Sequence, residues 1–96
     1  MAKNAKPLSE RELDEGLQAL EGWRVEEGEL RRQFKFRNFS EAIAWMVRVA
    51  IEAERLDHHP DWSNSWNKVD VRLRTHSIDA LSELDLKLAE KMNDFA

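Results

Sequence analysis

Residues 30–55, which read LRRQFKFRNFSEAIAWMVRVAIEAER, decide the fold class because they contain both kinds of hydrophobic periodicity. From 30 to 36 the apolar residues fall on one parity, a period of two that is typical of a half-buried strand. From Ser40 to about Arg55 the sequence is rich in alanine and has no helix breaker, so it predicts a helix. We expect the core face of this helix to consist of Ile43, Met46, Val47, Ala50 and Ala53.

The segment before this stretch predicts a helix and a short strand. Ser9-Glu10-Arg11-Glu12 is a capping box, in which the serine hydroxyl and the Glu12 carboxylate satisfy free amides at a helix start. Gly22 is expected to end this helix, and residues 23–25 to form a short strand that pairs with the strand over 30–36. The core face of the helix consists of Leu13, Leu17 and Leu20.

The segment after residue 55 predicts two strands and a last helix. Pro60 cannot continue a helix, and it pushes His59 toward an extended backbone. Alternation of apolar and charged residues predicts a strand over 69–73, and a partner strand is expected between His59 and Val69. Ser82 and Asp85 then cap the last helix. Its core stripe consists of Leu84, Leu88 and Met92, with Phe95 near the end.

The order of these elements predicts an α+β fold built as a single domain over residues 1–96. Strands joined by short turns pair antiparallel, and amphipathic helices bury their stripes against one face of a sheet. We therefore expect a two-layer sandwich in the order α-β-β-α-β-β-α, with a four-stranded antiparallel sheet and three helices on one face.

Composition excludes several classes of function. The chain has no cysteine, which excludes disulfides, thiolate metal sites and cysteine nucleophiles. No segment approaches the roughly 20 apolar residues of a membrane helix, and the lysines near the N-terminus precede no apolar run of a secretory signal. A net charge of −4 without a basic stripe disfavours nucleic-acid binding. We expect a soluble cytoplasmic protein that contacts neither nucleic acid nor membrane.

All three histidines lie between residues 58 and 76. Histidine has the side-chain pKa closest to neutrality, so it can give or take a proton at working pH. His58 and His59 stand where a helix must end, and His76 follows a predicted strand. The end of a helix and the end of a strand can meet at one rim of the sheet, which would bring the histidines together. The sequence therefore predicts acid–base chemistry at this rim, with surface histidines of no special role as the alternative.

Two other interpretations of the polar residues are open. A three-histidine zinc site needs imidazoles that converge on one point, but neighbours in an extended turn diverge, so we expect no metal. Asp85 has a purely structural explanation, since a carboxylate in the first helical turn stabilises the free amides there. Orientation of an imidazole by the same carboxylate is compatible with that role.

Read together, these positions resemble the pterin-4a-carbinolamine dehydratase family. The spaced pattern comprises Glu54, the run 55–60 with His-His-Pro, Trp66, His76 and Asp85. Further similarity is found at Glu21-Gly22-Trp23, Phe34-Lys35-Phe36, Met46-Val47-Arg48-Val49-Ala50, Asn67-Lys68-Val69 and Thr75-His76. The resemblance covers the chain from about residue 9 to the C-terminus.

The resemblance implies a hydro-lyase that converts a 4a-hydroxytetrahydropterin to quinonoid dihydropterin and water, in tetrahydrobiopterin recycling, with no cofactor. It implies that His58 and His76 are the acid–base pair and that His59 places the hydroxyl or helps to transfer the proton. By the same resemblance Asp85 would hold the His76 ring. Substrate would be bound around Asp57–His59 and Thr75–Ser77, that is Asp57, His58, His59, Thr75, His76 and Ser77, with Trp23 as a wall or donor.

The resemblance also implies partners. Family members form homodimers and homotetramers, and joining sheets edge to edge would remove an exposed strand edge. An aromatic amino-acid hydroxylase would supply the pterin substrate. The alternative function is a protein-interaction module, a dimerisation cofactor that acts without catalysis and does not require the histidines.

Overall fold

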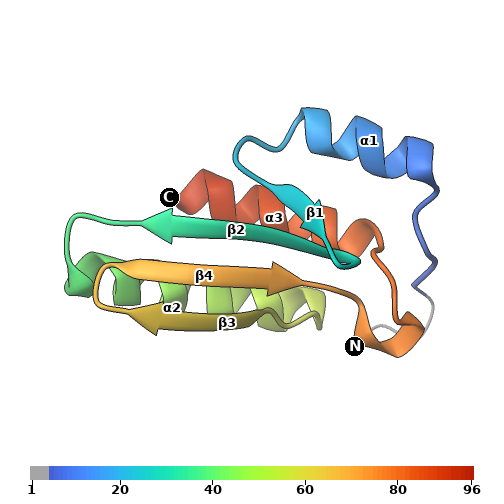
Figure 1. Cartoon of the computed structure of the whole chain (residues 1–96). Helices are drawn as coiled ribbons and strands as arrows, with labels where there is room; N and C mark the ends of the chain where they lie inside the picture. The colour runs from blue at the N-terminus through green and yellow to red at the C-terminus, as the bar shows by residue number, and fades with distance from the viewer. Residues whose placement is uncertain (1–4) are drawn as a thin grey trace.

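The computed structural model describes residues 5–96 and has the predicted order of elements (Figure 1). The helices are α1 (Glu10–Gln18), α2 (Phe39–Leu56) and α3 (Glu83–Phe95), and a single 3-10 turn, η1, spans His76–Ile78. The strands are β1 (Arg24–Glu26), β2 (Glu29–Lys35), β3 (Asp61–Ser65) and β4 (Lys68–Leu73). All strand pairs are antiparallel, in the order β1-β2-β4-β3. The predicted fold class is confirmed.

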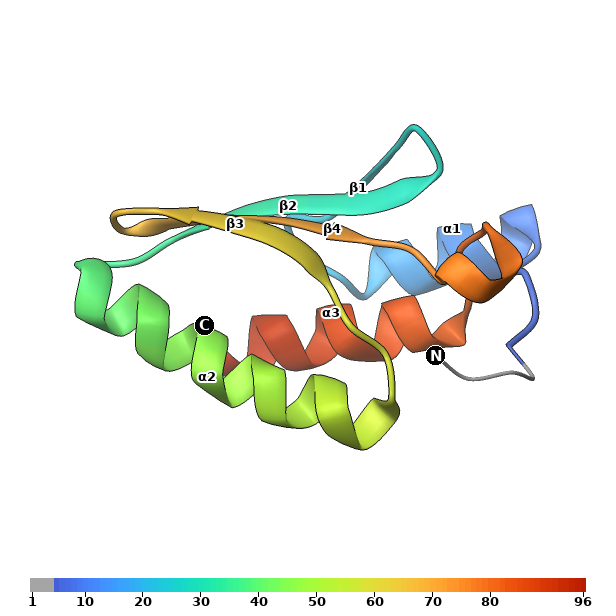
Figure 2. The ribbon, with the colours of Figure 1, turned by 90° about the horizontal axis from the view of Figure 1, so that it is seen from below.

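A view turned by 90° shows the sheet and the helices as two separate layers (Figure 2). α2 and α3 run beneath the sheet, and α1 lies beside its β1 end. Side chains of the inner sheet face, such as Leu30, Val71 and Leu73, are fully buried between the layers. α1 packs closely on α3, because a Cβ at Gly16 would stand 2.7 Å from Leu86 Cδ1. No helix in the described part of the chain is long and apolar enough to cross a membrane.

The predicted core face of α2 is wrong by part of a turn. Its buried residues are Ala42, Trp45, Val49 and Ala53. Of the predicted residues, Ala53 is buried and Met46 packs partly buried against the core. Ile43, Val47 and Ala50 instead face solvent, as do Phe39 and Ile51. α2 has two adjacent apolar stripes, and periodicity alone does not say which stripe meets the sheet. Trp45 decides the orientation, because its ring packs on Phe34 and its indole N–H donates to the Met92 carbonyl at 3.0 Å.

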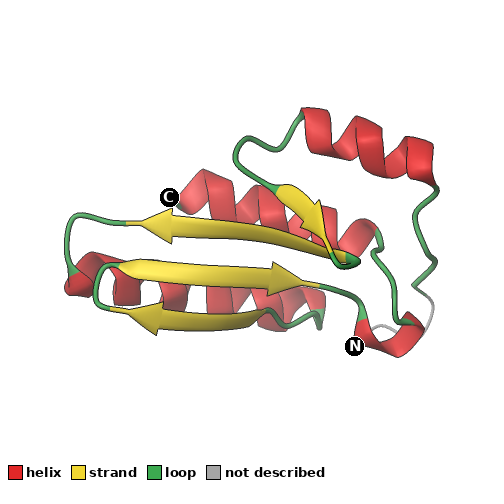
Figure 3. Ribbon diagram, viewed as in Figure 1, coloured by secondary structure: helices red, strands yellow, loops and turns green. Residues whose placement is uncertain are grey.

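Helix caps set the ends of the elements that carry the histidines. Both predicted capping boxes are present, at Ser9 with Glu12 and at Ser82 with Asp85. α2 ends at Asp57, whose backbone is left-handed with φ of 49°. η1 and the loops on either side of it lie beyond the end of β4, next to the start of β3 (Figure 3). The end of α2, the start of β3 and the end of β4 therefore meet at one rim of the sheet.

Candidate active site

His58 is buried at the point where the chain leaves α2. Its backbone N–H donates to the Ala53 carbonyl at 3.0 Å, which closes the end of the helix around the left-handed Asp57. The His58 side chain is 0% exposed, and its Nε2 lies 2.6 Å from Oδ1 of Asp85 on α3. A fully buried ring of this kind requires a hydrogen-bonding partner, and Asp85 supplies it.

The Asp85 carboxylate is the centre of a buried network of four residues. Its Oδ2 accepts hydrogen bonds from the Thr75 hydroxyl at 2.8 Å and from the Ser82 backbone N–H at 2.9 Å. The Thr75 and Ser82 hydroxyls are 2.6 Å apart. Since an ionised carboxylate only accepts, His58 donates through Nε2–H. Its Nδ1 is then a buried acceptor without a partner among the described residues. We call His58, Thr75, Ser82 and Asp85 the buried network.

His76 lies at the outer face of the sheet, away from the buried network, and its side chain is half exposed. Its Nε2 is 2.8 Å from Oδ2 of Asp61, the first residue of β3. Asp61 pairs in register with Arg72, whose neighbours Val71 and Leu73 point into the core, so Asp61 is on the outer face of the sheet. The exposed fraction of the His76 side chain is 43%. This ring is therefore open to a ligand from solvent.

His59 completes a set of exposed polar groups. Its Nε2 is 2.6 Å from Oε1 of Glu54 in the last turn of α2, and its side chain is 49% exposed. His59 stands two residues before Asp61 in the chain, and its partner Glu54 belongs to α2, the helix beneath the sheet. We call His59, Asp61 and His76 the outer site. The predicted divergence of His58 and His59 is confirmed, since one ring is buried and the other is exposed.

The partner predicted for Asp85 is wrong. Asp85 holds His58, and Asp61 holds His76. The error has a physical reason: Asp85 lies on the inner side of the sheet, and His76 is fixed on the outer side by the β3–β4 register. Asp61 was missed because its role depends on that register. The one signal for it in the sequence is an acidic residue directly after the proline that starts the strand.

The remaining predicted site residues occupy three different environments. Thr75 belongs to the buried network, whereas Asp57 and Ser77 are exposed beside His58 and His76. Trp23 is buried in the core, and its indole N–H donates to Asn93 at 2.8 Å, so that N–H is not available to a substrate in this structure. Trp66 is exposed in the turn at the far end of the β3–β4 hairpin.

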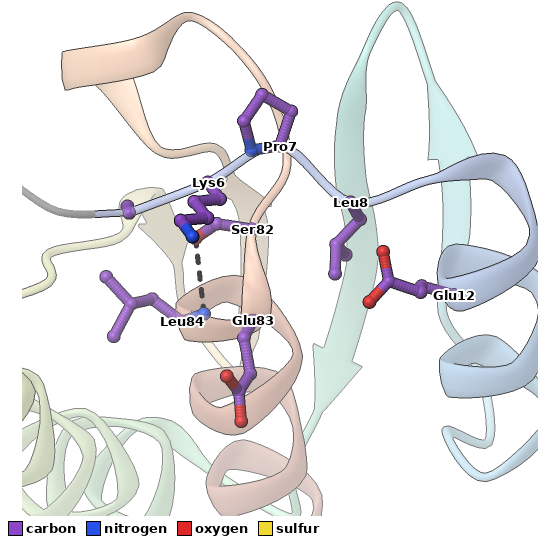
Figure 4. A pocket seen from close by; sticks show the side chains of 8 residues that line it. Lys6, Pro7, Leu8, Glu12, Ser82, Glu83 and Leu84 are labelled. Atoms are coloured by element: carbon purple, nitrogen blue, oxygen red, sulfur yellow. Dashed lines mark hydrogen bonds between the residues drawn. The ribbon is translucent and has the colours of Figure 1, made fainter.

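A surface hollow borders the buried network at Ser82. It has a volume of about 480 Å³ and lies between the N-terminal segment and the start of α3, with Ser82, Glu83 and Leu84 on one wall (Figure 4). Lys6 and Glu12 contribute charged groups from the other side. None of its lining residues is a histidine. The hollow is therefore separate from the outer site.

Three histidine–carboxylate pairs define what this rim can do chemically. In each pair Nε2 faces a carboxylate, at 2.6 to 2.8 Å, which leaves Nδ1 for another partner. A carboxylate on one ring nitrogen orients the imidazole and stabilises the imidazolium that forms when the other nitrogen takes a proton. No group of three or more potential ligands able to hold a metal ion occurs within residues 5–96. The arrangement suits proton transfer by imidazole.

Comparisons with known proteins agree on one family. The family model described as pterin 4 alpha carbinolamine dehydratase matches residues 6–95. A protein of Brucella ovis that carries the provisional name pterin-4-alpha-carbinolamine dehydratase is 49% identical over 98 residues, covering 100% of this chain and 99% of the relative. A solved structure from Brucella melitensis, described as a transcriptional coactivator/pterin dehydratase, superposes with a TM-score of 0.91 at 47% identity, covering 95% of this chain and 99% of the other.

Proposed function

This chain belongs to the pterin 4 alpha carbinolamine dehydratase family, and we propose that it is a hydro-lyase that dehydrates a 4a-hydroxytetrahydropterin. The products are quinonoid dihydropterin and water. The N5 proton leaves to a base, the N5–C4a double bond forms, and the C4a–O bond breaks as an acid protonates the departing hydroxyl. One acid and one base near neutrality are sufficient for this reaction, and each contributes about 10²- to 10⁴-fold in rate.

The observation that carries this proposal is the outer site, in which the half-exposed His76 is held by Asp61 and the half-exposed His59 stands two residues before Asp61 in the chain. His76 is held by Asp61 through Nε2, so it takes the N5 proton at Nδ1. His59 is also half exposed and serves as the acid that protonates the 4a-hydroxyl. Both rings are accessible from solvent, so a ligand can reach each of them without opening of the fold.

Burial changes the role that we propose for His58. The resemblance implies His58 and His76 as the acid–base pair, but the His58 ring has no exposed surface in this structure. Direct proton transfer at its Nδ1 would require the 57–60 turn to open. We therefore propose that His58, with Asp85, anchors this turn and so positions His59. Asp57 and Ser77 would then contribute to the walls around the pterin ring, and the buried Thr75 and Trp23 would support the walls from inside.

The test is the decay of enzymatically generated 4a-hydroxytetrahydropterin, followed by ultraviolet absorbance with the spontaneous rate subtracted. Wild type should accelerate decay, and His76→Ala and His59→Ala should each lose about 10²- to 10⁴-fold in kcat while remaining folded by circular dichroism. Arg24→Ala is the matched control, because Arg24 is exposed on β1, the edge strand opposite β3, and pairs with Glu26. A wild type that does not exceed the spontaneous rate would contradict the proposal.

We also propose that the chain forms a homo-oligomer. The exposed stripe on α2 supports a second copy as partner, because four large apolar side chains face solvent on one helix: Phe39, Ile43, Val47 and Ile51. Light scattering at micromolar concentration should give at least twice the monomer mass, and a mass near 11 kDa would contradict the proposal. A hydroxylase that produces the 4a-hydroxy adduct is the expected source of substrate, with the cytoplasm as the proposed location.

A further inference from the structure

Both ring nitrogens of His76 have protein partners. Nε2 faces the Asp61 carboxylate at 2.8 Å, and Nδ1 lies 3.3 Å from the Nη2 of Arg74. Arg74 is the second residue before His76, in the segment that links β4 to η1. At His76, therefore, Nδ1, the ring nitrogen that does not face the carboxylate, also contacts a protein group.

The chemistry of the two partners assigns the proton on the ring. Arginine has only donors, so the Nδ1 that Arg74 contacts is an acceptor and carries no proton. The carboxylate of Asp61 only accepts, so Nε2 carries the proton and donates it. With both partners in place, His76 is a neutral imidazole whose lone pair on Nδ1 is occupied by Arg74.

Arg74 is held in this position by a second contact. Its Nη1 is 2.7 Å from Oδ1 of Asp79, the residue that follows η1 with a left-handed backbone. The two nitrogens of one guanidinium therefore bridge Asp79 and His76. The contact with His76 is long, and both side chains reach solvent, so a ligand can replace it at modest cost.

We propose that Arg74 is a positioning residue that covers Nδ1 of His76 and competes with the substrate for it. This inference rests on the proposed function, in which Nδ1 accepts the substrate proton. Arg74 keeps the lone pair unprotonated and aimed outward until the N5–H of the pterin takes the place of the guanidinium. Asp61 acts on the opposite nitrogen and orients the ring throughout.

The two flanking residues are therefore expected to have opposite kinetic signatures. Removing Arg74 abolishes the competition for Nδ1, so Arg74→Ala should lower KM by about 2- to 10-fold, the net effect of one long, solvent-exposed hydrogen bond, and change kcat by less than about twofold. Removing Asp61 leaves the ring without orientation, so Asp61→Ala should lower kcat by about 10-fold or more with little change in KM. Arg24→Ala, which removes an exposed paired arginine on β1, the edge strand opposite β3, should change neither constant.

A result of unchanged or raised KM in Arg74→Ala, with an active wild type, would overturn this inference and leave the proposed function intact. A wild type without dehydratase activity would overturn the proposed function itself. Nitrogen-15 NMR of the histidine rings tests the contact without any substrate. The His76 Nδ1 resonance should move in Arg74→Ala and stay in place in Arg24→Ala, and an unmoved resonance in Arg74→Ala would overturn the contact.

Discussion

The buried network and the outer site each contain a histidine whose Nε2 is held by an aspartate, yet they differ in almost everything else. The Nε2–Oδ distance is 2.6 Å for His58 with Asp85 and 2.8 Å for His76 with Asp61. The first pair is fully buried and shares its carboxylate with two further donors, whereas the second pair is nearly half exposed. The same pair of side chains is thus closed to solvent in one place and open to it in the other, and only the open pair is accessible for the proton transfer that we propose.

The sharpest test of this difference is the removal of the buried carboxylate. Asp85→Ala leaves His58, Thr75 and the Ser82 N–H without their acceptor in a site that water does not reach. We expect the free energy of unfolding to fall by about 3–5 kcal/mol, measured by urea titration. Asp94→Ala, on the exposed side of the same helix, is the control. A loss below about 1 kcal/mol would show that the network does not stabilise the fold.

A smaller change isolates one donor of the network. Thr75→Val keeps the shape of the side chain but removes the hydroxyl that donates to Asp85 and contacts Ser82. Because the buried Asp85 oxygen then lacks one donor, unfolding should become easier by about 1–3 kcal/mol in the same titration. Thr75→Ser, which retains the hydroxyl, should recover part of that loss. Equal stabilities of the two variants would argue against a role for this hydrogen bond.

The corresponding change in the outer site should cost far less. Asp61→Ala removes the partner of His76 at a position where water can solvate both groups. Exposed ion pairs contribute about 0–1 kcal/mol, so the free energy of unfolding should change by no more than that, although activity falls. A loss as large as that of Asp85→Ala would erase the distinction between the two regions.

The smallest effect on stability is expected at the capping box of Ser9 and Glu12, which is exposed, whereas the box of Ser82 and Asp85 is buried. Hydrogen bonds from the backbone N–H and hydroxyl of Ser9 hold the pKa of the exposed Glu12 below its ordinary value of 4.5. A depressed carboxyl pKa stabilises the fold above that value, and the contribution is lost as pH falls through the folded-state pKa. Glu12→Gln should therefore lower Tm slightly at pH 7, and the difference should vanish at a pH well below 4.5, under the lowered pKa of Glu12 in the folded state. Thermal scans at both pH values check this, and a difference that persists in acid would contradict it.

The sequence predicted those features that depend on local physical chemistry. Capping boxes, the period-two strands and the helix end before Pro60 need only a few neighbouring residues, and the fold class follows from their order. The orientation of α2 could not be predicted, because Val47 and Val49 are equally apolar and only packing decides which is buried. The pairing of Asp85 with His58 and of Asp61 with His76 depends on which side of the sheet each side chain faces, and that is set by register across strands.

The hydrogen bond between His58 and Asp85 also has a consequence for the kinetics of folding. It joins residues 27 positions apart and ties the end of α2 to the start of α3, so both strands of the β3–β4 hairpin lie within the loop that it closes. Closing such a loop costs conformational entropy before the hydrogen bond can stabilise the chain. We therefore expect the bond between His58 and Asp85 to form after the folding transition state. Weakening this contact should then accelerate unfolding and leave the rate of folding nearly unchanged. A chevron plot of Thr75→Val would show whether the buried network forms after the transition state and so controls the unfolding rate of the native state.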